Sequence, residues 1–410
     1  MKSIPDPRDP TKITYPLPLI IWLGCLMFLT KVESRRQVTW RFKSDRFLKH
    51  LNYLGQAECE NVPHGDTLKY SMSRVQPEAL SGLREKMVKR ILRMRCLEQY
   101  RLLGRYWLVA IDGTGQYWFK EKHCEKCLVK EIRPGVKIYY HHVLEAKLIF
   151  YNGLSLSLET EFIEKQPDKK KQDCEYNAFF RLAKRLKKTY PQLKICLSMD
   201  SLYANRPVMD LCKQNRWSYV ITFKKGSMPD VYDWYGRIKK LHPENKSKLR
   251  FKEGIIQHYA WVSPLEHYSE DRIFHVLECD EDKRNGKKTK YVWLTDIPIT
   301  QKNHQQIANY GGRLRWKIEN QGFNMQKNGG YRLEHLYSTN ERAMKNFYLL
   351  LQIAHFINQL IEKGSLLKKS FANGLGSIRN IAHQLLEDLR CIELDPSCLN
   401  VKFQIRMDSS

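Results

Sequence analysis

Two short apolar runs that each end in an aspartate constrain the fold of this chain most. The run from Tyr106 to Ile111 leads directly into Asp112 and a glycine turn, and the run from Ile195 to Met199 leads into Asp200. Runs this short and this apolar are typical of central strands that are buried on both faces of a sheet. Adjacent strands lie about 4.8 Å apart, so acids at matching strand positions can share divalent cations. The bland alternative is that each aspartate is a turn residue or a helix cap.

The chain is expected to be an α/β protein in which helical parts flank a mixed sheet. Strand-like and helical patterns alternate through the segment that holds both aspartates, which predicts βαβ connections. The predicted parts are a helical N-terminal region at 1–104, the first part of the α/β core at 105–225, a β-rich insertion at 226–298, a core helix at 299–335 and C-terminal helices at 336–410.

A strong excess of positive charge predicts a polyanionic partner. The 410 residues include 70 Lys and Arg against 44 Asp and Glu, a formal net charge of +26. Nucleic acid is the first expectation and an acidic membrane surface is the second. The N-terminal region is a candidate DNA-binding region, because its last predicted helix, Pro77 to Leu103, carries seven basic residues: Arg84, Lys86, Lys89, Arg90, Arg93, Arg95 and Arg101.

The sequence favours a soluble intracellular protein. The longest apolar run, Leu17 to Thr30, has 14 residues and contains Pro18, whereas a membrane span needs about 20 apolar residues. This run therefore predicts a buried helix of the N-terminal region. The 11 cysteines are odd in number and mostly lie inside apolar runs, which indicates a reducing compartment.

Glu319 is the candidate for a third carboxylate beside the two aspartates. It lies in a helix predicted from Thr300 to about Asn328, next to a stripe of Ile307, Tyr310, Leu314 and Ile318. Three carboxylates can hold two Mg²⁺ ions about 4 Å apart, which lower the pKa of a water and stabilise the attacking and leaving oxygens at phosphorus. The two aspartates occur together with a basic helix that carries Glu319 and with a strongly basic chain. This combination favours a metal site over the alternative of turn residues and helix caps.

Three segments resemble bacterial insertion-sequence transposases of the DDE class. They are Asp112-Gly113-Thr114, Met199-Asp200-Ser201 and the helix segment Arg315-Trp316-Lys317-Ile318-Glu319-Asn320-Gln321-Gly322-Phe323-Asn324. The resemblance extends from about Ile4 to Leu389. It implies an RNase H-like core interrupted by a β-insertion, with Asp112, Asp200 and Glu319 as catalytic ligands of Mg²⁺ or Mn²⁺.

The resemblance also implies the reaction and its partners. Water would cleave DNA at a transposon end, and the freed 3′-hydroxyl would attack target DNA, without a covalent enzyme intermediate. The partners implied are terminal inverted repeats, target DNA and a second copy of the chain, in the nucleoid-associated cytoplasm of a bacterium. Arg315 matches an arginine of the family's helix signature, and Gln326 stands where that signature has lysine, with Lys327 one residue later. Arg313, Arg315 and Lys327 are the candidate phosphate-binding residues.

A separate cluster of cysteine and histidine is a candidate zinc site. Cys124, Cys127 and His141 supply three ligands of the types that zinc prefers, and His123 or His142 supplies the fourth. The alternative is a surface hairpin with two reduced cysteines.

Two other functions remain open on the sequence alone. One is a nuclease of the same fold that cuts DNA but does not transpose it, and the other is a decayed transposase that only binds. The three acids argue against decay.

Overall fold

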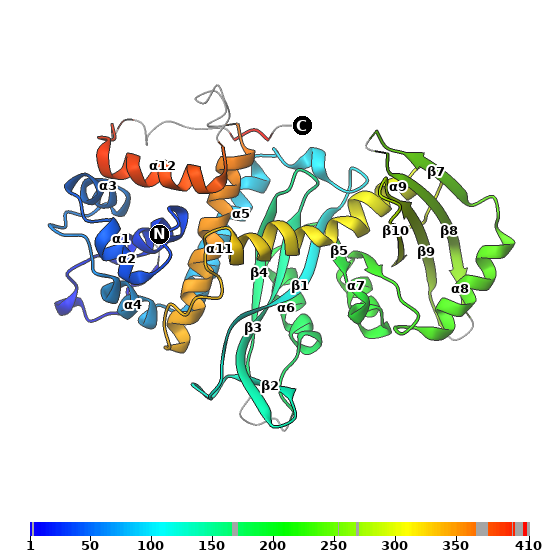
Figure 1. Ribbon diagram of the computed structural model, residues 1–410, viewed down its shortest axis with the longest axis horizontal. Coiled ribbons are helices and arrows are strands. Elements are labelled where there is room, and N and C mark those ends of the chain that lie inside the picture. Colours follow the sequence, from blue (N-terminus) through cyan, green and yellow to red (C-terminus); the bar gives the residue numbers. More distant parts are fainter. Residues whose placement is uncertain are drawn as a thin grey trace.

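In the computed structural model, a ten-stranded mixed sheet runs through the molecule and helices flank it (Figure 1). The structure describes residues 1, 4–165, 171–252, 254–267, 270–365, 376–395, 397 and 405–407. The strands are β1 (Trp107–Phe119), β2 (Leu128–Arg133), β3 (Val136–Ile149), β4 (Ser155–Ile163), β5 (Ile195–Met199), β6 (Ser218–Thr222), β7 (Lys246–Arg250), β8 (Ile256–Glu266), β9 (Ile273–Asp282) and β10 (Lys288–Thr295). The α/β class predicted from the sequence is confirmed.

The two apolar runs that precede Asp112 and Asp200 lie side by side at the centre of the sheet. The glycine turn predicted directly after Asp112 is wrong, because β1 continues through these glycines to Phe119 in its pairing with β3. The sheet order is β2-β3-β1-β5-β6-β10-β9-β8-β7, and β4 pairs with β3. β1, β5 and β6 run parallel, whereas β3 pairs antiparallel with β1 on one side and with β4 on the other. Helices α6 (Glu175–Thr189) and α7 (Arg206–Asn215) make the connections between the parallel strands, as their alternation in sequence predicts.

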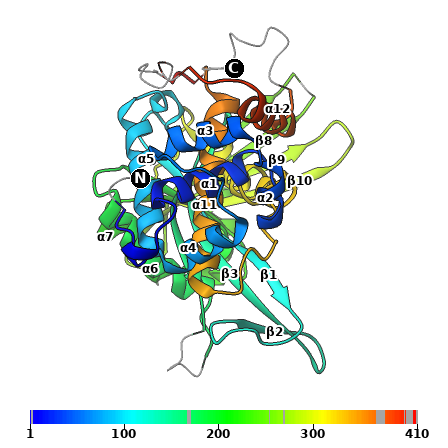
Figure 2. The same ribbon diagram turned by 90° about the vertical axis from the view of Figure 1, so that its left-hand side faces the viewer.

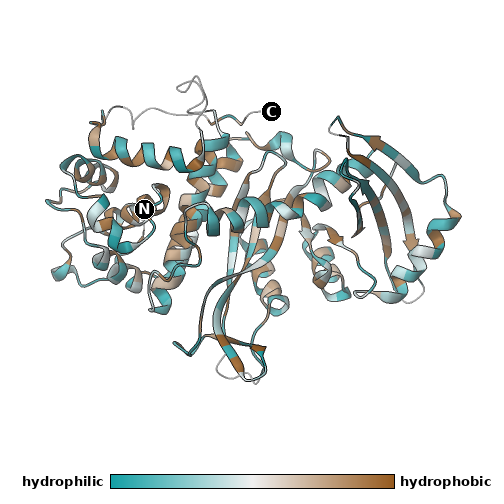
Figure 3. Cartoon of the chain, in the orientation of Figure 1, coloured by the Kyte–Doolittle hydropathy of each residue, from teal (hydrophilic) through white to brown (hydrophobic). Residues whose placement is uncertain are grey.

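The N-terminal helices share one hydrophobic core with the last part of the chain. They are α1 (Leu17–Leu29), α2 (Arg35–Arg41), α3 (Asp45–Gly55), α4 (Gly65–Arg74) and α5 (Pro77–Arg93). They pack around α11 (Glu341–Lys363), and α12 (Ile378–Cys391) lies over α3 (Figure 2). α1 is apolar on all sides and buried, as predicted, and Figure 3 shows the ribbon of α1 and α11 coloured largely as hydrophobic residues. Within the described ranges, no helix has the length and apolar character to cross a bilayer.

Helix α5 is shorter than its periodicity predicts and turns one of its basic residues inward. It ends at Arg93, and Arg95 then takes a left-handed conformation with φ of 55°. Arg84 is 1% exposed, and its guanidinium donates to the hydroxyls of Ser157 at 2.9 Å and Thr160 at 2.5 Å on β4. Arg84 therefore holds the helix to the sheet and is not available to DNA.

The segment predicted as a β-rich insertion begins with a helix and then extends the central sheet. Helix α8 (Pro229–Leu241) precedes strands β7 to β10, and β10 pairs antiparallel with β6 of the core. The prediction missed α8, although Val231, Trp234, Tyr235 and Ile238 follow the i, i+3, i+4, i+7 spacing of an amphipathic helix.

The helix that carries Glu319 is a succession of helical segments from His304 to Asn328 and crosses the sheet (Figure 1). Its parts are α9 (His304–Gln306), the π segment η4 (Ile307–Gly312), the 3₁₀ segment η5 (Arg313–Arg315), the π segment η6 (Ile318–Asn324) and α10 (Met325–Asn328). The π segments shift the periodicity, so the predicted buried stripe is wrong at Tyr310, which is 46% exposed. π segments are frequent at functional sites.

Gly312 sets the distance between this helix and the sheet. A Cβ atom at residue 312 would lie 2.2 Å from Nε1 and 2.3 Å from Cε2 of Trp293, whose side chain is buried on β10. The helix backbone therefore lies directly on the indole ring, and no larger residue fits there without displacing the helix.

We predict that Gly312→Ala destabilises the fold by at least about 1–3 kcal/mol, because a buried indole cannot give way as a flexible side chain does. The matched control is Gly236→Ala in α8, where a Cβ meets nothing within 4 Å. That change is expected to raise the Tm, because alanine has the higher helix propensity and stabilises the folded chain by about 1 kcal/mol at most. Thermal unfolding of both variants measures the contrast, and equal Tm values would contradict this account of the contact.

Candidate functional site

Asp112 and Asp200 come to the same edge of the sheet from adjacent parallel strands. The pairing of β1 with β5 runs from Trp107 opposite Ile195 to Ala110 opposite Ser198, and two residues further each strand reaches its aspartate. β5 ends at this point, whereas β1 continues along β3, where Asp112 is paired with Glu145. The side of β1 beyond the end of β5 is therefore open to groups approaching from both faces of the sheet.

Each aspartate also makes a local hydrogen bond of the kind expected if it were only a turn residue or a helix cap. Asp200 Oδ1 accepts from the backbone N–H of Leu202 at 2.9 Å and caps the short helix η3 (Ser201–Tyr203). Asp112 Oδ1 accepts from the backbone N–H of Gly113 at 3.1 Å. These bonds occupy one carboxylate oxygen of each residue, so the second oxygen is left for other partners.

Arg315 contacts the second oxygen of Asp112. Its Nη1 lies 3.2 Å from Asp112 Oδ2, and its guanidinium stacks over the ring of Trp316. Burial raises the pKa of Asp112 to about 6, Arg315 opposes this shift, and the negative charges of Glu175 and Asp200 add to it. Asp112 therefore lies in a small pocket of negative charge in which one arginine is the compensating cation.

Glu319 lies one helical turn beyond Arg315 and is exposed. Among the described residues, Asp112, Asp200 and Glu319 are not a group whose oxygens all lie within 4.8 Å of one another. The segment η6 packs on β1, but the charged groups that act on Asp112 are Arg315, Glu175 and Asp200 and do not include Glu319. The triad stays a prediction.

The two other predicted phosphate-binding residues are engaged with acids. Arg313 pairs with the buried carboxylate of Glu281 on β9 and stacks over Tyr291. Lys327 Nζ lies 2.9 Å from Glu334 Oε1. Arg313 is thus a structural link between the helix and the sheet, and Lys327 would have to leave Glu334 to reach a phosphate.

Sequence reasoning missed two residues beside Asp112, namely Glu175 and His142. Glu175 is in the first turn of α6, and its Oε1 lies 2.8 Å from Nε2 of His142 on β3. A Cβ atom at Gly113 would lie 2.3 Å from that same Oε1 and 2.5 Å from His142 Nε2. The Glu175–His142 pair therefore covers the backbone next to Asp112. The sequence did contain one sign of this pair, because a glycine inside a strand, such as Gly113, often marks a place where another group approaches the backbone closely.

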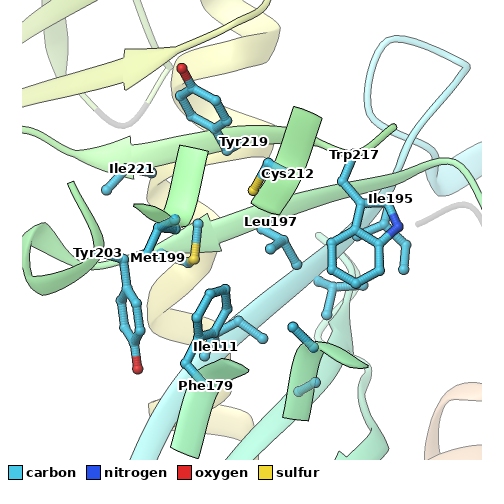
Figure 4. Close-up of a cluster of buried hydrophobic side chains, with 14 of the residues drawn as sticks. Ile111, Phe179, Ile195, Leu197, Met199, Tyr203, Cys212, Trp217, Tyr219 and Ile221 are labelled. Atoms are coloured by element: carbon cyan, nitrogen blue, oxygen red, sulfur yellow. The ribbon is translucent and has the colours of Figure 1, made fainter. Parts of the chain in front are cut away.

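Tyr203 is a third residue that sequence reasoning missed. Its surroundings bear on whether the acids could hold a cation. Its side chain is 1% exposed, and its hydroxyl has no hydrogen-bond partner within the described part of the chain. Figure 4 shows the ring against Phe179 with the hydroxyl directed away from Met199. The charges of Glu175, Asp200 and Asp112 raise the pKa of Tyr203 in addition to its burial. A buried hydroxyl without a partner, three residues after Asp200 and packed on α6 one turn after Glu175, fits a site that holds a hydrated hard cation such as Mg²⁺.

The cysteine and histidine residues predicted near β2 come together as a four-residue cluster. His123, Cys124, Cys127 and His141 each offer one ligand atom, and these atoms lie within 4.8 Å of one another. Sγ of Cys124 is 3.2 Å from Sγ of Cys127, and His141 Nε2 is 3.4 Å and 3.6 Å from the two sulfurs. His123 Nδ1 lies 2.9 Å from Cys127 Sγ. The cluster could bind a metal, and its fourth member is His123.

Cys127 and His141 of the cluster are buried, His123 and Cys124 are partly exposed, and the segment between the cysteines is tied to α11. Burial lowers the pKa of His141 to about 4, so its imidazole is neutral, as a metal ligand must be. Burial and the neighbouring Cys127 raise the pKa of Cys124 to about 11 in the absence of a metal. Between the two cysteines, Lys126 pairs with Glu341 at the start of α11 and with Glu164 after β4.

No protein-family model matches this chain, and no curated protein is significantly similar to it in sequence. Its functional assignment rests on the geometry and chemistry of its own residues.

We predict opposite effects on stability for two acids that are paired across β1 and β3. Asp112→Asn is expected to keep or raise the Tm at pH 7, because a raised carboxyl pKa means that the charged form is less favourable in the folded chain than in the unfolded one. Glu145→Gln is expected to cost about 3 kcal/mol or more, since Glu145 is fully buried among hydrogen-bond donors and near Lys147. A marked loss of Tm in Asp112→Asn would show that Asp112 is structural.

Proposed function

We propose that this chain is a DNA transposase of the DDE class, which cleaves DNA and transfers the cut strand with the help of bound divalent metal ions. The observation that carries the proposal is the pair of aspartates on adjacent parallel strands, next to a helix that holds a third acid and a phosphate-type arginine. The order β4-β3-β1-β5-β6, with helices on the parallel connections, is compatible with an RNase H-like core.

In the proposed reaction, water attacks a phosphorus atom at the end of the element. An O–P bond forms as the bond to the 3′-oxygen breaks, which leaves a 3′-hydroxyl and a 5′-phosphate. The freed 3′-hydroxyl then attacks a phosphodiester of target DNA in a second exchange of the same kind. Asp112, Asp200 and Glu319 would hold Mg²⁺ or Mn²⁺, which would activate the attacking water and stabilise charge on the attacking and leaving oxygens.

Arg315 has two successive roles in this proposal. In the protein alone it compensates the charge of Asp112. A cation at Asp112 would compete for that carboxylate, and the released guanidinium would then be free to hold a phosphate in a bidentate manner. The same helix carries Lys327 for a second phosphate contact, after release from Glu334.

The proposal includes the partners that the resemblance implies. The net charge of +26 suits duplex DNA, namely the terminal repeats and the target. A homodimer would hold two ends together, in the nucleoid-associated cytoplasm of a bacterium. A nuclease of the same fold would cut the same DNA without joining it, so strand transfer is the decisive readout.

We also propose that the metal of the His123, Cys124, Cys127 and His141 cluster is zinc. Two thiolates and two imidazoles are a common tetrahedral zinc set. The sulfur separation of 3.2 Å exceeds a disulfide bond of about 2.05 Å and is near the ~3.7 Å that two Zn–S bonds of about 2.3 Å require. Zinc would fix the loop between β1 and β2 to β3.

Substitution of the acids is expected to separate catalysis from binding. With Mg²⁺ and DNA that carries both flanks of the gene, Asp112→Asn, Asp200→Asn and Glu319→Gln should each lower strand transfer more than about 100-fold, since loss of even an outer-shell partner of a metal costs 10–100-fold. Duplex binding, measured by gel shift, should persist. Asp230→Asn, an exposed acid of α8, is the control. Unchanged strand transfer in either aspartate variant would refute the assignment.

The zinc proposal predicts about one zinc per chain in protein purified without chelator. Cys124→Ser, Cys127→Ser and His123→Ala should lose it, whereas Cys391→Ser and His142→Ala should keep it, because Cys391 is exposed on α12 and His142 contacts Glu175 instead. Elemental analysis measures the content. Zinc-free wild type, or equal zinc in all variants, would remove the site.

A further inference from the structure

We propose that Glu175 is a further carboxylate of the divalent-metal site at Asp112 and Asp200, and that His142 is the residue that positions it. This inference rests on the proposed function for the location of the site, and it adds a ligand from a helix that lies on the other face of the sheet from Glu319.

The backbone places Glu175 at the open edge beyond β5. Successive side chains of a strand point to opposite faces. Asp112 points to the face where Arg315 lies, and the position of a side chain at residue 113 points to the face of α6. The Glu175 carboxylate fills that position against Gly113. Asp112 and Glu175 thus approach the end of β5 from the two faces, and Asp200 follows that strand directly.

Tyr203 provides an observation independent of the acids. It follows Asp200 by three residues, and its ring packs on Phe179, one turn after Glu175 in α6. Its hydroxyl is buried and has no hydrogen-bond partner among the described residues. A buried polar group without a partner indicates a missing ligand or water. Within the described part of the chain, the ligand atoms of Asp112, Asp200 and Glu175 do not all lie within 4.8 Å of one another, so a hydrated cation would bridge them through its waters and could supply that partner.

His142 holds Glu175 through one oxygen only. The contact at 2.8 Å involves Oε1, and Oε2 makes no hydrogen bond to any part of the chain that the structure describes. Carboxylates that ligate metals are commonly fixed by such an outer partner, which leaves the other oxygen for the ion. A purely structural role, in contrast, would be the favourable placement of an acid in the first turn of α6.

Mn²⁺ binding to the full-length, zinc-loaded chain without DNA tests the inference by calorimetry. Asp112→Asn first identifies the site by abolishing the binding that depends on it. Glu175→Gln is expected to lower the Mn²⁺ affinity of that site at least tenfold, Glu175→Asp to restore part of it, and His142→Gln to lower it about tenfold. Glu78→Gln, which removes an exposed first-turn acid from α5, should leave it unchanged.

Gly113→Ala provides a variant in which both side chains are kept. Its Cβ would displace Glu175 and His142 from the edge of β1, so it should also lower the Mn²⁺ affinity. Far-UV circular dichroism establishes that each variant is folded. Wild-type affinity in Glu175→Gln, or an affinity in Gly113→Ala and His142→Gln equal to that of wild type, would overturn the inference, as would wild-type chain that binds no Mn²⁺ through Asp112.

Strand transfer measured on the same preparations distinguishes this failure from that of the proposed function. Mn²⁺ binding that depends on Glu175 in a chain without strand transfer would support the carboxylate site and refute the transposase. Strand transfer that requires Asp112 and Asp200, with Mn²⁺ affinity indifferent to Glu175, would support the transposase and refute the fourth carboxylate.

Discussion

A buried polar layer between the sheet and α11 is the constraint on which the rest of this structure depends. Glu145 is fully buried on β3 and accepts hydrogen bonds from Ser157 at 2.6 Å and from Tyr348 at 3.0 Å. Lys147, two residues on, is equally buried and donates to Gln352 of α11, and burial lowers its pKa to about 8. Removing one member would leave a charge without its partner in a dry interior, which is far more costly than an unmade surface contact.

This layer fixes the helices and strands that carry the candidate site relative to one another. Arg84 of α5 donates a hydrogen bond to the hydroxyl of Ser157 on β4. The side-chain amide of Gln359 on α11 hydrogen-bonds both the N–H and the carbonyl of Ser155 at the start of that strand. The N-terminal helices, the sheet and α11 are therefore fixed to one another through β3 and β4. Asp112 lies on the next strand, opposite Glu145, so its backbone position is determined by this network although its own side chain faces the open edge.

The parts of the fold that the sequence predicts are those in which a local pattern and its surroundings agree. The runs before Asp112 and Asp200 are apolar throughout, and they are central strands. The buried face predicted for the helix around Tyr310 is wrong, because a π segment adds a residue to the helical turn and no residue type in the sequence indicates it. Spacing and ligand chemistry predicted the cluster of Cys124, Cys127 and His141, but they left His123 and His142 as alternatives for its fourth member, which the structure shows to be His123. Glu175 could not be found in this way, since its proximity to Asp112 depends on how α6 packs against β1 and β3, a contact between distant segments.

Positive charge in the sequence divides into structural and available cations only when the fold is known. Arg181 and Arg185, in the acid-free stretch before Asp200, pair with Glu161 of β4, and Arg185 also reaches Glu159. These arginines hold α6 against the sheet. The net charge is unaffected by such pairing, so it still favours a polyanion, but the surface that meets DNA has to come from other residues.

Strand β3 links the carboxylates to the cysteine cluster through two successive histidines. Because neighbouring side chains of a strand point to opposite faces, His141 reaches the sulfurs of Cys124 and Cys127 while His142 reaches Glu175. The two groups differ in ligand chemistry, sulfur and imidazole on one side and carboxylate oxygen on the other, so any metals that they bound would differ. A metal in the cysteine cluster would fix the β3 backbone at His141, and one residue later that backbone determines where the imidazole of His142 holds Glu175. The cluster would thus act on the carboxylates through position, without touching the reacting groups.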